Sequence, residues 1–330
     1  MPEAIEWGSA RLRSIRDLTP DIRLFEIEPS GEFVPPTPGS HINVAVQIRE
    51  RPDVRSYSII GSCLDGVYRI AVKLLPDTRG GSAYMWRLAP GARMTISKPG
   101  NHFELGRNRP EYLLLAGGIG ITPIYTMTMA LAQSNAKFRL IYACRRRQDL
   151  AFGDELKERI GNRLQVFVDE EGARANLDAE IARLAPGGEL YVCGPIGMLE
   201  AARRAWQRSN RPVDGLRFET FGNSGRFATE PFTVKIPRLG VEVEVLQNET
   251  MLEALEKAGV AMIFDCRRGE CGLCALEILQ TEGPIDHRDV FFSDEEKAAG
   301  TKLCTCVSRV AGGSITVDTP DRAVALGARP

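Results

Sequence analysis

The sequence predicts a multidomain chain with an antiparallel β-barrel, an α/β doubly wound sheet and a small α+β unit, in that order. Its 330 residues exceed the size of one ordinary hydrophobic core. Short alternating runs separated by proline and glycine fill the first third, and strand-like runs alternate with helix-like segments in the middle third. Three cysteines crowd into residues 266–274 of the last third.

The composition is that of a folded protein without a charge bias. It contains 43% hydrophobic and 26% charged residues, and its formal net charge is −1. This balance favours neither nucleic acid nor a membrane as a partner. No apolar run reaches the roughly 18 residues of a membrane span, and the N-terminus lacks the apolar core of a signal peptide. We expect a cytoplasmic protein, whose clustered cysteines bind metal or do redox chemistry more often than they form disulfides.

Each module is predicted from its pattern of elements. Little helical periodicity interrupts the short runs of residues 1–108, a pattern typical of an antiparallel barrel or sandwich, and we predict the barrel. Residues 109–222 begin with a buried strand and a glycine turn, and their strand–helix alternation predicts a parallel sheet. Residues 223–330 contain a polar linker, two alternating strands, an amphipathic helix and a late strand. The β-like runs of the barrel cover residues 22–29, 41–48, 54–62, 68–75 and 93–100.

The crowded cysteines predict an iron–sulfur cluster. Cys266, Cys271 and Cys274 follow the spacing C-x4-C-x2-C, which is typical of plant-type [2Fe–2S] sites. Two glycines between them let the chain wrap around a cluster and point backbone N–H groups at its sulfurs. Zinc is the alternative, but zinc sites mostly use paired C-x2-C units or mixtures of cysteine and histidine, and His287 is isolated.

The stretches "CRRGECGLCALEIL" and "TCVSR" and the helix before them resemble a plant-type ferredoxin domain. With the two preceding modules, essentially all 330 residues resemble the phthalate dioxygenase reductase (vanillate demethylase reductase) family. The resemblance implies an FMN-binding barrel, a NAD-binding domain and a C-terminal ferredoxin domain in one chain.

Two cysteines compete to be the fourth metal ligand. Between Cys274 and Cys304 lie 29 residues, the spacing of plant ferredoxins themselves, and 31 residues separate Cys274 from Cys306. In the resembling family the last ligand directly precedes a segment of the Val-Ser-Arg type, as Cys306 does here. A surface loop tolerates two extra residues. We therefore predict Cys306 as the ligand and Cys304 as a small buried residue.

The segment "RSYS", Arg55 to Ser58, is where the resembling family holds its flavin. An aromatic ring stacks on isoalloxazine, hydroxyls bond ring heteroatoms, and arginine holds phosphate. A glycine turn opening a helix follows and suits a phosphate, although an ordinary helix cap has the same pattern. The resemblance and the single turn favour FMN over FAD, and Phe221 is either a flavin contact or a core anchor. The predicted contacts are Arg55, Ser56, Tyr57, Ser58, Ala71, Val72, Lys73, Arg79, Gly80, Gly81, Ser82 and Phe221.

Two glycine-bearing turns form the predicted nicotinamide site. "LLLAGGIGITP" joins a buried strand to a helix, so its backbone suits a dinucleotide phosphate, but an ordinary tight turn looks the same. "YVCGP" follows a second buried strand, and the resemblance implies that Cys193 contacts the ring. No acid or base is required, and Ser58 and Cys193 line the hydride-transfer site. The predicted residues are Gly117, Gly118, Gly120, Thr122, Pro123, Cys193, Gly194 and Pro195.

The choice between NADH and NADPH depends on "CRRRQD", residues 144–149. Its arginines are either a 2′-phosphate site or a solvated cationic run. The resembling family mostly uses NADH, and the acidic "VDEEG" does not argue for an extra phosphate. We predict NADH, with NADPH as the alternative.

The resemblance implies the reductase component of a multicomponent oxygenase. Hydride passes from NADH to FMN, and electrons then pass singly through the [2Fe–2S] cluster to a terminal Rieske-type oxygenase. One alternative acceptor is a diiron or haem monooxygenase; a zinc-bound interaction module without enzymatic activity is a second alternative. We expect a monomer, and Arg267 and Arg268 either face an acidic patch on the oxygenase or are ordinary surface charge.

Overall fold

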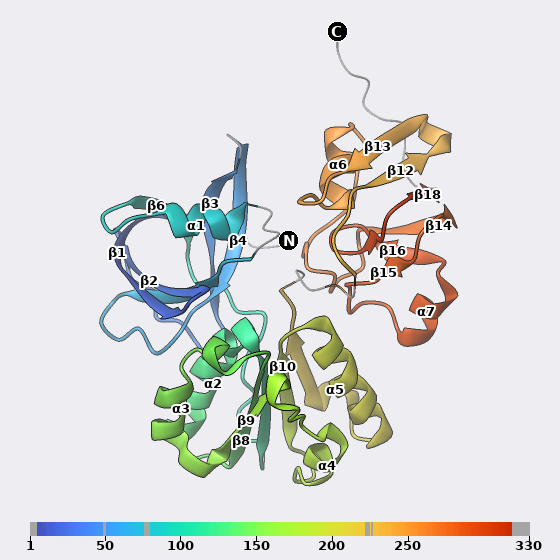
Figure 1. Ribbon diagram of the computed structural model, residues 1–330. Coiled ribbons are helices and arrows are strands. Elements are labelled where there is room, and N and C mark those ends of the chain that lie inside the picture. The colour runs from blue at the N-terminus through green and yellow to red at the C-terminus, as the bar shows by residue number, and fades with distance from the viewer. Residues whose placement is uncertain (1–4, 49–50, 76–79, 222–224, 226, 319–330) are drawn as a thin grey trace. The chain divides into compact units, whose positions relative to one another are not determined.

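The computed structural model describes residues 5–48, 51–75, 80–221, 225 and 227–318. The chain divides into two compact units, Met1–Glu219 and Thr220–Pro330 (Figure 1). The first unit holds an antiparallel and a parallel sheet, and the second holds a mixed sheet, which confirms the predicted fold class. The finer boundaries at residues 108 and 222 remain predictions. In the part of the chain described, no helix is long and apolar enough to cross a membrane.

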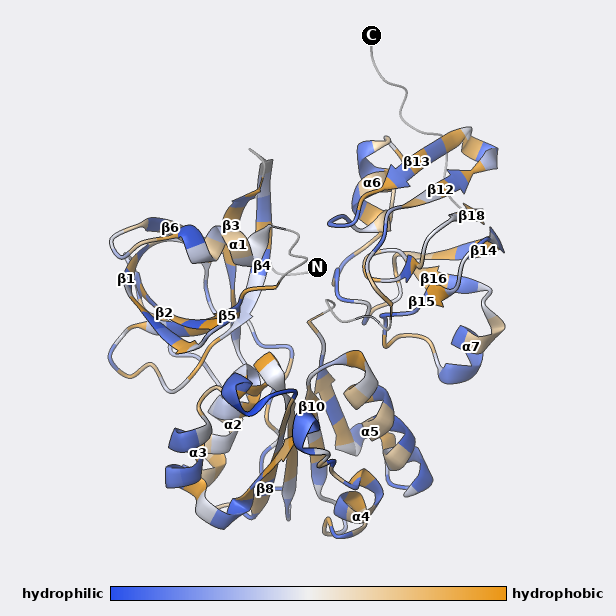
Figure 2. Ribbon diagram, in the orientation of Figure 1, coloured by the Kyte–Doolittle hydropathy of each residue, from blue (hydrophilic) through white to orange (hydrophobic). Residues whose placement is uncertain are grey.

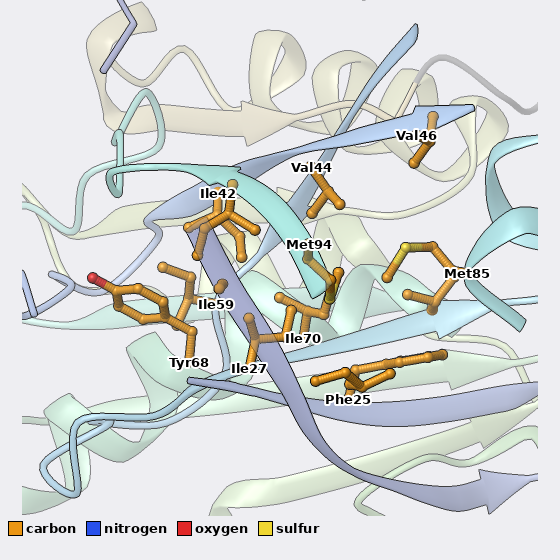
Figure 3. Close-up of a cluster of buried hydrophobic side chains, with 14 of the residues drawn as sticks. Phe25, Ile27, Ile42, Val44, Val46, Ile59, Tyr68, Ile70, Met85 and Met94 are labelled. Carbon is orange, nitrogen blue, oxygen red and sulfur yellow. The ribbon is translucent and has the colours of Figure 1, made fainter. Parts of the chain in front are cut away.

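Six antiparallel strands form the first sheet, in the order β4-β3-β6-β1-β2-β5. A bridge between Ile59, one residue beyond β4, and Ile70 in β5 closes this sheet into a barrel. Inward-facing residues such as Phe25, Ile42 and Met85 fill the interior (Figure 3). The elements are β1 (Trp7–Thr19), β2 (Ile22–Pro29), β3 (His41–Ile48), β4 (Arg51–Ser58), β5 (Tyr68–Lys73), α1 (Gly81–Arg87) and β6 (Arg93–Ser97).

Strand β1 is absent from the sequence-based prediction. It pairs with β2 across register shifts between Leu12 and Ser14 and between Asp17 and Thr19. Each shift is a bulge or irregularity that interrupts the period-2 alternation by which a strand is recognised. Pairing with β2 and β6 stabilises the strand, although its own sequence pattern does not predict it.

The parallel sheet has the order β11-β10-β7-β8-β9. Every residue of β7 and β10 is buried, as expected for strands covered by helices on both faces. Helix α5 is amphipathic and alternates hydrophobic and hydrophilic segments (Figure 2). The strands are β7 (Tyr112–Gly117), β8 (Phe138–Cys144), β9 (Leu164–Val168), β10 (Glu189–Cys193) and β11 (Leu216–Glu219), and the helices are η1 (Gly118–Gly120), α2 (Ile121–Gln133), η2 (Arg147–Asp149), α3 (Gly153–Ile160), η3 (Gly161–Arg163), η4 (Asp169–Glu171), α4 (Leu177–Ala182), α5 (Ile196–Arg208) and η5 (Val213–Gly215).

The second unit packs α6 against a sheet of order β13-β12-β18-β14-β16. A Thr250–Glu253 capping box starts α6, because each side chain satisfies a backbone N–H at the helix end. The cysteine segment lies between α6 and β14. The elements are β12 (Phe232–Ile236), η6 (Pro237–Leu239), β13 (Val241–Val245), α6 (Met251–Lys257), β14 (Ala275–Thr281), β15 (Ile285–Asp286), α7 (Asp294–Ala299), β16 (Lys302–Cys304), β17 (Arg309–Val310) and β18 (Ser314–Asp318).

Candidate functional site

The cysteine loop, residues 266–274, contains no helix or strand. Its shape depends on Gly269, whose φ of +76° is in the left-handed region. A Cβ atom on Gly269 would lie 2.6 Å from Val307 Cγ2 and 2.8 Å from Asp289 Cα. Only glycine therefore lets the loop lie this close to the segment that carries Cys306.

Backbone N–H groups of the loop converge on one sulfur. Arg268, Glu270 and Cys271 each donate to Cys266 Sγ at 3.4 Å. Burial raises the pKa of the Cys266 thiol, and these three donors oppose that rise because they favour the thiolate. Such N–H donors tune the reduction potential of iron-bound thiolates, so the loop fits an iron–sulfur cluster.

The two candidate fourth ligands both lie near Cys274. Hydrogen bonds from the Cys304 and Cys306 thiols lower the pKa of Cys274 to about 3. Cys306 also accepts a backbone hydrogen bond from Gly269 and interacts electrostatically with Cys266. Cys304 interacts electrostatically with Asp289. Cys306 thus faces the cysteine loop more directly. This placement supports Cys306 as the fourth ligand, and the assignment remains a prediction.

The geometry also bears on the type of metal site. All eight cysteines lie in the described residues, and all are free thiols. Within the described ranges, no three Cys, His, Asp or Glu side chains gather as they would around one metal ion. Zinc needs four ligands around one ion, whereas a [2Fe–2S] cluster shares its cysteines between two irons. Either site requires free thiols such as these.

The loop arginines are paired within the second unit. Arg267 lies 3.3 Å from Glu256 and stacks on Phe264 with its guanidinium carbon 4.2 Å from the ring centre. Arg268 lies 3.4 Å from Glu270. Both arginines hold the loop in place, and a role in docking remains a prediction.

The predicted flavin strand and the glycine turn meet in the first unit. Arg55 of β4 forms an ion pair of 2.7 Å with Asp53. Its side chain also lies against Gly81, where a Cβ atom would be 2.6 Å from Arg55 Nε. Gly80, with a φ of +99°, turns the chain into α1. A cation beside this turn fits a phosphate-binding role, and Arg79 falls outside the described residues.

Hydroxyl groups along β4 point to different partners. Ser56 donates to Asn43 Oδ1 at 2.6 Å. Burial raises the pKa of the half-buried Tyr57, which keeps its phenol neutral. Ser58 is buried, and its hydroxyl donates to Glu219 Oε2 at 3.5 Å, a long hydrogen bond.

The other predicted flavin contacts lie on β5 and α1. Ala71 is buried, and Val72 belongs to the barrel core, so Val72 would offer a flavin only its backbone. Lys73 forms an ion pair of 3.2 Å with Asp21. The Ser82 hydroxyl accepts from the Leu75 N–H at 3.5 Å.

The structure packs the two predicted nicotinamide turns directly together. A Cβ atom on Gly120 would overlap the carbonyl oxygen of Cys193, and one on Gly117 would lie 2.6 Å from Pro195 Cδ. Gly118, with a φ of +52°, has open space where its Cβ would be. The glycines therefore permit close packing at Gly117 and Gly120 and leave an open face at Gly118. Thr122 and Pro123 are buried in the first turn of α2, and Gly194 lies against Gly117.

One residue of this site was missed by sequence reasoning. Glu219 pairs with Cys193 in the β10–β11 register and also accepts the Ser58 hydrogen bond. The useful signal was its position at the carboxyl end of a strand, where open α/β sheets bind ligands. Cys193 is 0% exposed, so its predicted contact with a nicotinamide requires neighbouring atoms to move. Phe221 lies in the second unit, and its flavin contact remains a prediction.

Comparisons with known proteins agree with this geometry. A 2Fe-2S iron-sulfur cluster binding domain matches residues 234–311, and an oxidoreductase NAD-binding domain matches residues 114–204. These matches confirm the iron–sulfur and NAD interpretations of the two motifs.

Relatives of known function resemble the whole chain. The carnitine monooxygenase reductase subunit of Escherichia coli (strain K12) is 33% identical over 93% of this chain and 97% of its own. The heme-dependent oxidative N-demethylase beta subunit of Ectopseudomonas mendocina is 35% identical over 93% of this chain and 97% of its own. The solved structure of phthalate dioxygenase reductase superposes with a TM-score of 0.72 and 30% identity, covering 95% of this chain and 98% of that one. The chain belongs to the phthalate dioxygenase reductase family of oxygenase reductase subunits.

Proposed function

We propose that this protein takes hydride from NADH onto FMN and delivers electrons singly, through a [2Fe–2S] cluster, to a Rieske-type oxygenase. The observation that carries the proposal is the loop whose three backbone N–H groups point at Cys266, on the same chain as a NAD-binding sheet. The family resemblance supports a Rieske-type acceptor, and a cytoplasmic location and a monomeric state are further parts of the proposal. The division into modules 1–108, 109–222 and 223–330 is part of the same proposal.

The chain's own residues bind and orient the cofactors. When bound, FMN accepts hydride and the cluster carries single electrons. We assign the phosphate of FMN to Arg55 and the turn at Gly80 and Gly81, which lies against that arginine. We assign the cluster to Cys266, Cys271, Cys274 and Cys306. Ser58, Cys193 and Glu219 line the place where nicotinamide and flavin meet, since the carboxyl ends of β10 and β11 bring the last two together.

Anaerobic titration tests the proposal. The purified protein should be brown-yellow and contain about two iron and two sulfide atoms per chain. NADH added without oxygen should bleach first the flavin and then the cluster absorption. A colourless preparation that contains zinc would contradict the proposal, as would a flavin that neither NADH nor NADPH reduces.

The preference for NADH over NADPH rests on charge at the ends of β8 and β9. Cys144 and Val168 are paired neighbours, so the segments that follow them lie side by side, next to the strand that leads into the glycine turn. Arg147 is held by Glu171 at 2.7 Å, and Glu170 accepts from the Arg147 N–H at 3.2 Å. Arg146 pairs similarly with Asp149, so two of the three arginines of this segment are neutralised by carboxylates. A 2′-phosphate would therefore meet carboxylates.

We expect Glu171→Gln to raise the ratio of kcat/KM for NADPH over NADH about tenfold. The change removes a carboxylate that repels the 2′-phosphate, and it frees the Arg147 guanidinium from its ion pair with Glu171. The double variant Glu171→Gln/Arg147→Gln should lose this gain. Steady-state kinetics with both nucleotides measure the ratio.

The matched control is Asp178→Asn, which breaks a comparable exposed pair of 2.8 Å with Arg208 on α4 and α5. It should leave the ratio unchanged. An equal ratio in Glu171→Gln and the wild type would show that this ion pair plays no part in nucleotide choice.

A haem protein is the second candidate acceptor. The relative from Ectopseudomonas mendocina is the beta subunit of a heme-dependent oxidative N-demethylase and matches this chain over nearly its whole length. Product formation with a Rieske oxygenase, compared with a haem monooxygenase under the same NADH supply, separates the two acceptors.

A further inference from the structure

The second unit buries the carboxylate of Asp289, which has no role in the proposed electron transfer. Asp289 lies between β15 and α7, and its side chain is 0% exposed. Its Oδ1 accepts from the Ser308 hydroxyl at 3.1 Å, and its Oδ2 accepts from the Phe292 N–H at 3.0 Å. A carboxylate survives burial only when such donors replace the lost water.

Two basic side chains surround this carboxylate. Lys297 Nζ lies 3.9 Å from Asp289 Oδ2 and donates to the Asp289 carbonyl oxygen at 2.6 Å. His287 Nδ1 lies 3.5 Å from Oδ1. Burial acts to raise the pKa of Asp289, but His287, Lys297 and the Phe292 N–H together hold it below its ordinary value. The carboxylate is therefore ionised at neutral pH.

Asp289 touches the cysteine loop through its backbone. A Cβ atom on Gly269 would lie 2.8 Å from Asp289 Cα, and the N–H of the next residue, Val290, donates to the Gly269 carbonyl at 2.9 Å. This contact joins the residues around Asp289 to the middle of the loop that binds the cluster.

Asp289 also touches the segment that carries the fourth ligand. Ser308, its hydroxyl donor, lies two residues beyond Cys306 and donates its N–H to the Cys304 carbonyl at 2.9 Å. A single buried anion thus adjoins both chain segments that frame the cluster, without being a predicted ligand.

We propose that Asp289 is a positioning residue that joins the cysteine loop to the Cys306 turn and whose buried charge lowers the reduction potential of the cluster. This inference rests on the proposed [2Fe–2S] site. Reduction adds an electron to the cluster, and a nearby negative charge with little water around it opposes that addition. Lys297 is the opposing charge and partly offsets the effect.

Potentiometric titration of the cluster-loaded protein, followed by electron paramagnetic resonance, tests the inference. Asp289→Asn keeps the shape and removes the charge, so the midpoint potential should shift upward. Lys297→Gln removes the cation and should shift it downward. The matched control is Glu242→Gln. Glu242 lies on β13, at the opposite edge of the sheet from β16, and its carboxylate pairs with Lys235. This variant should leave the potential unchanged.

Opposite shifts in the two variants support the inference, because a merely structural role would not reverse sign with charge. An Asp289→Asn potential equal to or below that of the wild type overturns it. If Asp289→Asn does not retain a cluster, an unchanged or raised potential in Lys297→Gln overturns it instead. A wild-type protein without any iron–sulfur signal contradicts the proposed function, which is a distinguishable outcome.

Discussion

Cys306→Ala is expected to abolish the iron–sulfur absorption and resonance signals, whereas Cys304→Ala should leave both nearly intact. Removing one thiolate of four leaves one iron atom with only one of its two cysteine ligands. Cys306 accepts a hydrogen bond from Gly269 and lies within range of the charge of Cys266, so it faces the cysteine loop. Cys304 ends β16 in an apolar cluster that also contains Leu252, Phe292 and Cys306, so alanine there removes a hydrogen bond to Cys274 but, by this assignment, no iron ligand.

The measurement combines absorption spectra with iron and sulfide analysis of both variants. Both cysteines are buried, at 0% and 3% exposure, so loss of packing alone affects the two variants similarly. The difference between them therefore reports ligation. Loss of the cluster in Cys304→Ala and its retention in Cys306→Ala would show that loop length, and not the adjoining "VSR", identifies the ligand.

Gly120→Ala is expected to destabilise the α/β sheet and to slow flavin reduction by NADH on the order of 100-fold. The φ of −62° at Gly120 suits alanine, so the penalty comes only from the added Cβ atom. That atom would overlap the carbonyl oxygen of Cys193, a backbone atom that no rotamer change moves away. Overpacking of this kind costs about 1–3 kcal/mol. It also spreads the two turns, and misplacing a reacting group by about 1 Å costs roughly 100-fold in rate.

Thermal unfolding and stopped-flow reduction by NADH measure the two effects. Gly197→Ala is the matched control, because Gly197 lies in the first turn of α5 with no atom within 4 Å of its added Cβ. Alanine there should leave reduction unchanged and stabilise the helix by about 0.5–1 kcal/mol. Equal rates in Gly120→Ala and the control would disprove the packing argument.

Regular elements were predictable wherever packing imposes a single period. Strand β3 at residues 41–48 has the predicted bounds, because it presents one apolar face to a core. Strand β1 escaped prediction because bulges between Leu12 and Ser14 and between Asp17 and Thr19 break its alternation.

The chemistry of this protein could be predicted from local patterns, namely the ligand spacing at residues 266–274 and the two glycine turns. Contacts between side chains far apart in the chain became visible in the folded protein alone. Glu219 accepts a hydrogen bond from Ser58, which is 161 positions away in the sequence, and the backbone of Asp289 packs against Gly269. No local sequence pattern indicates either contact. The reason is physical. Ligand spacing and turn geometry depend on neighbouring residues, whereas a buried charge is placed by the strands and helices that pack around it.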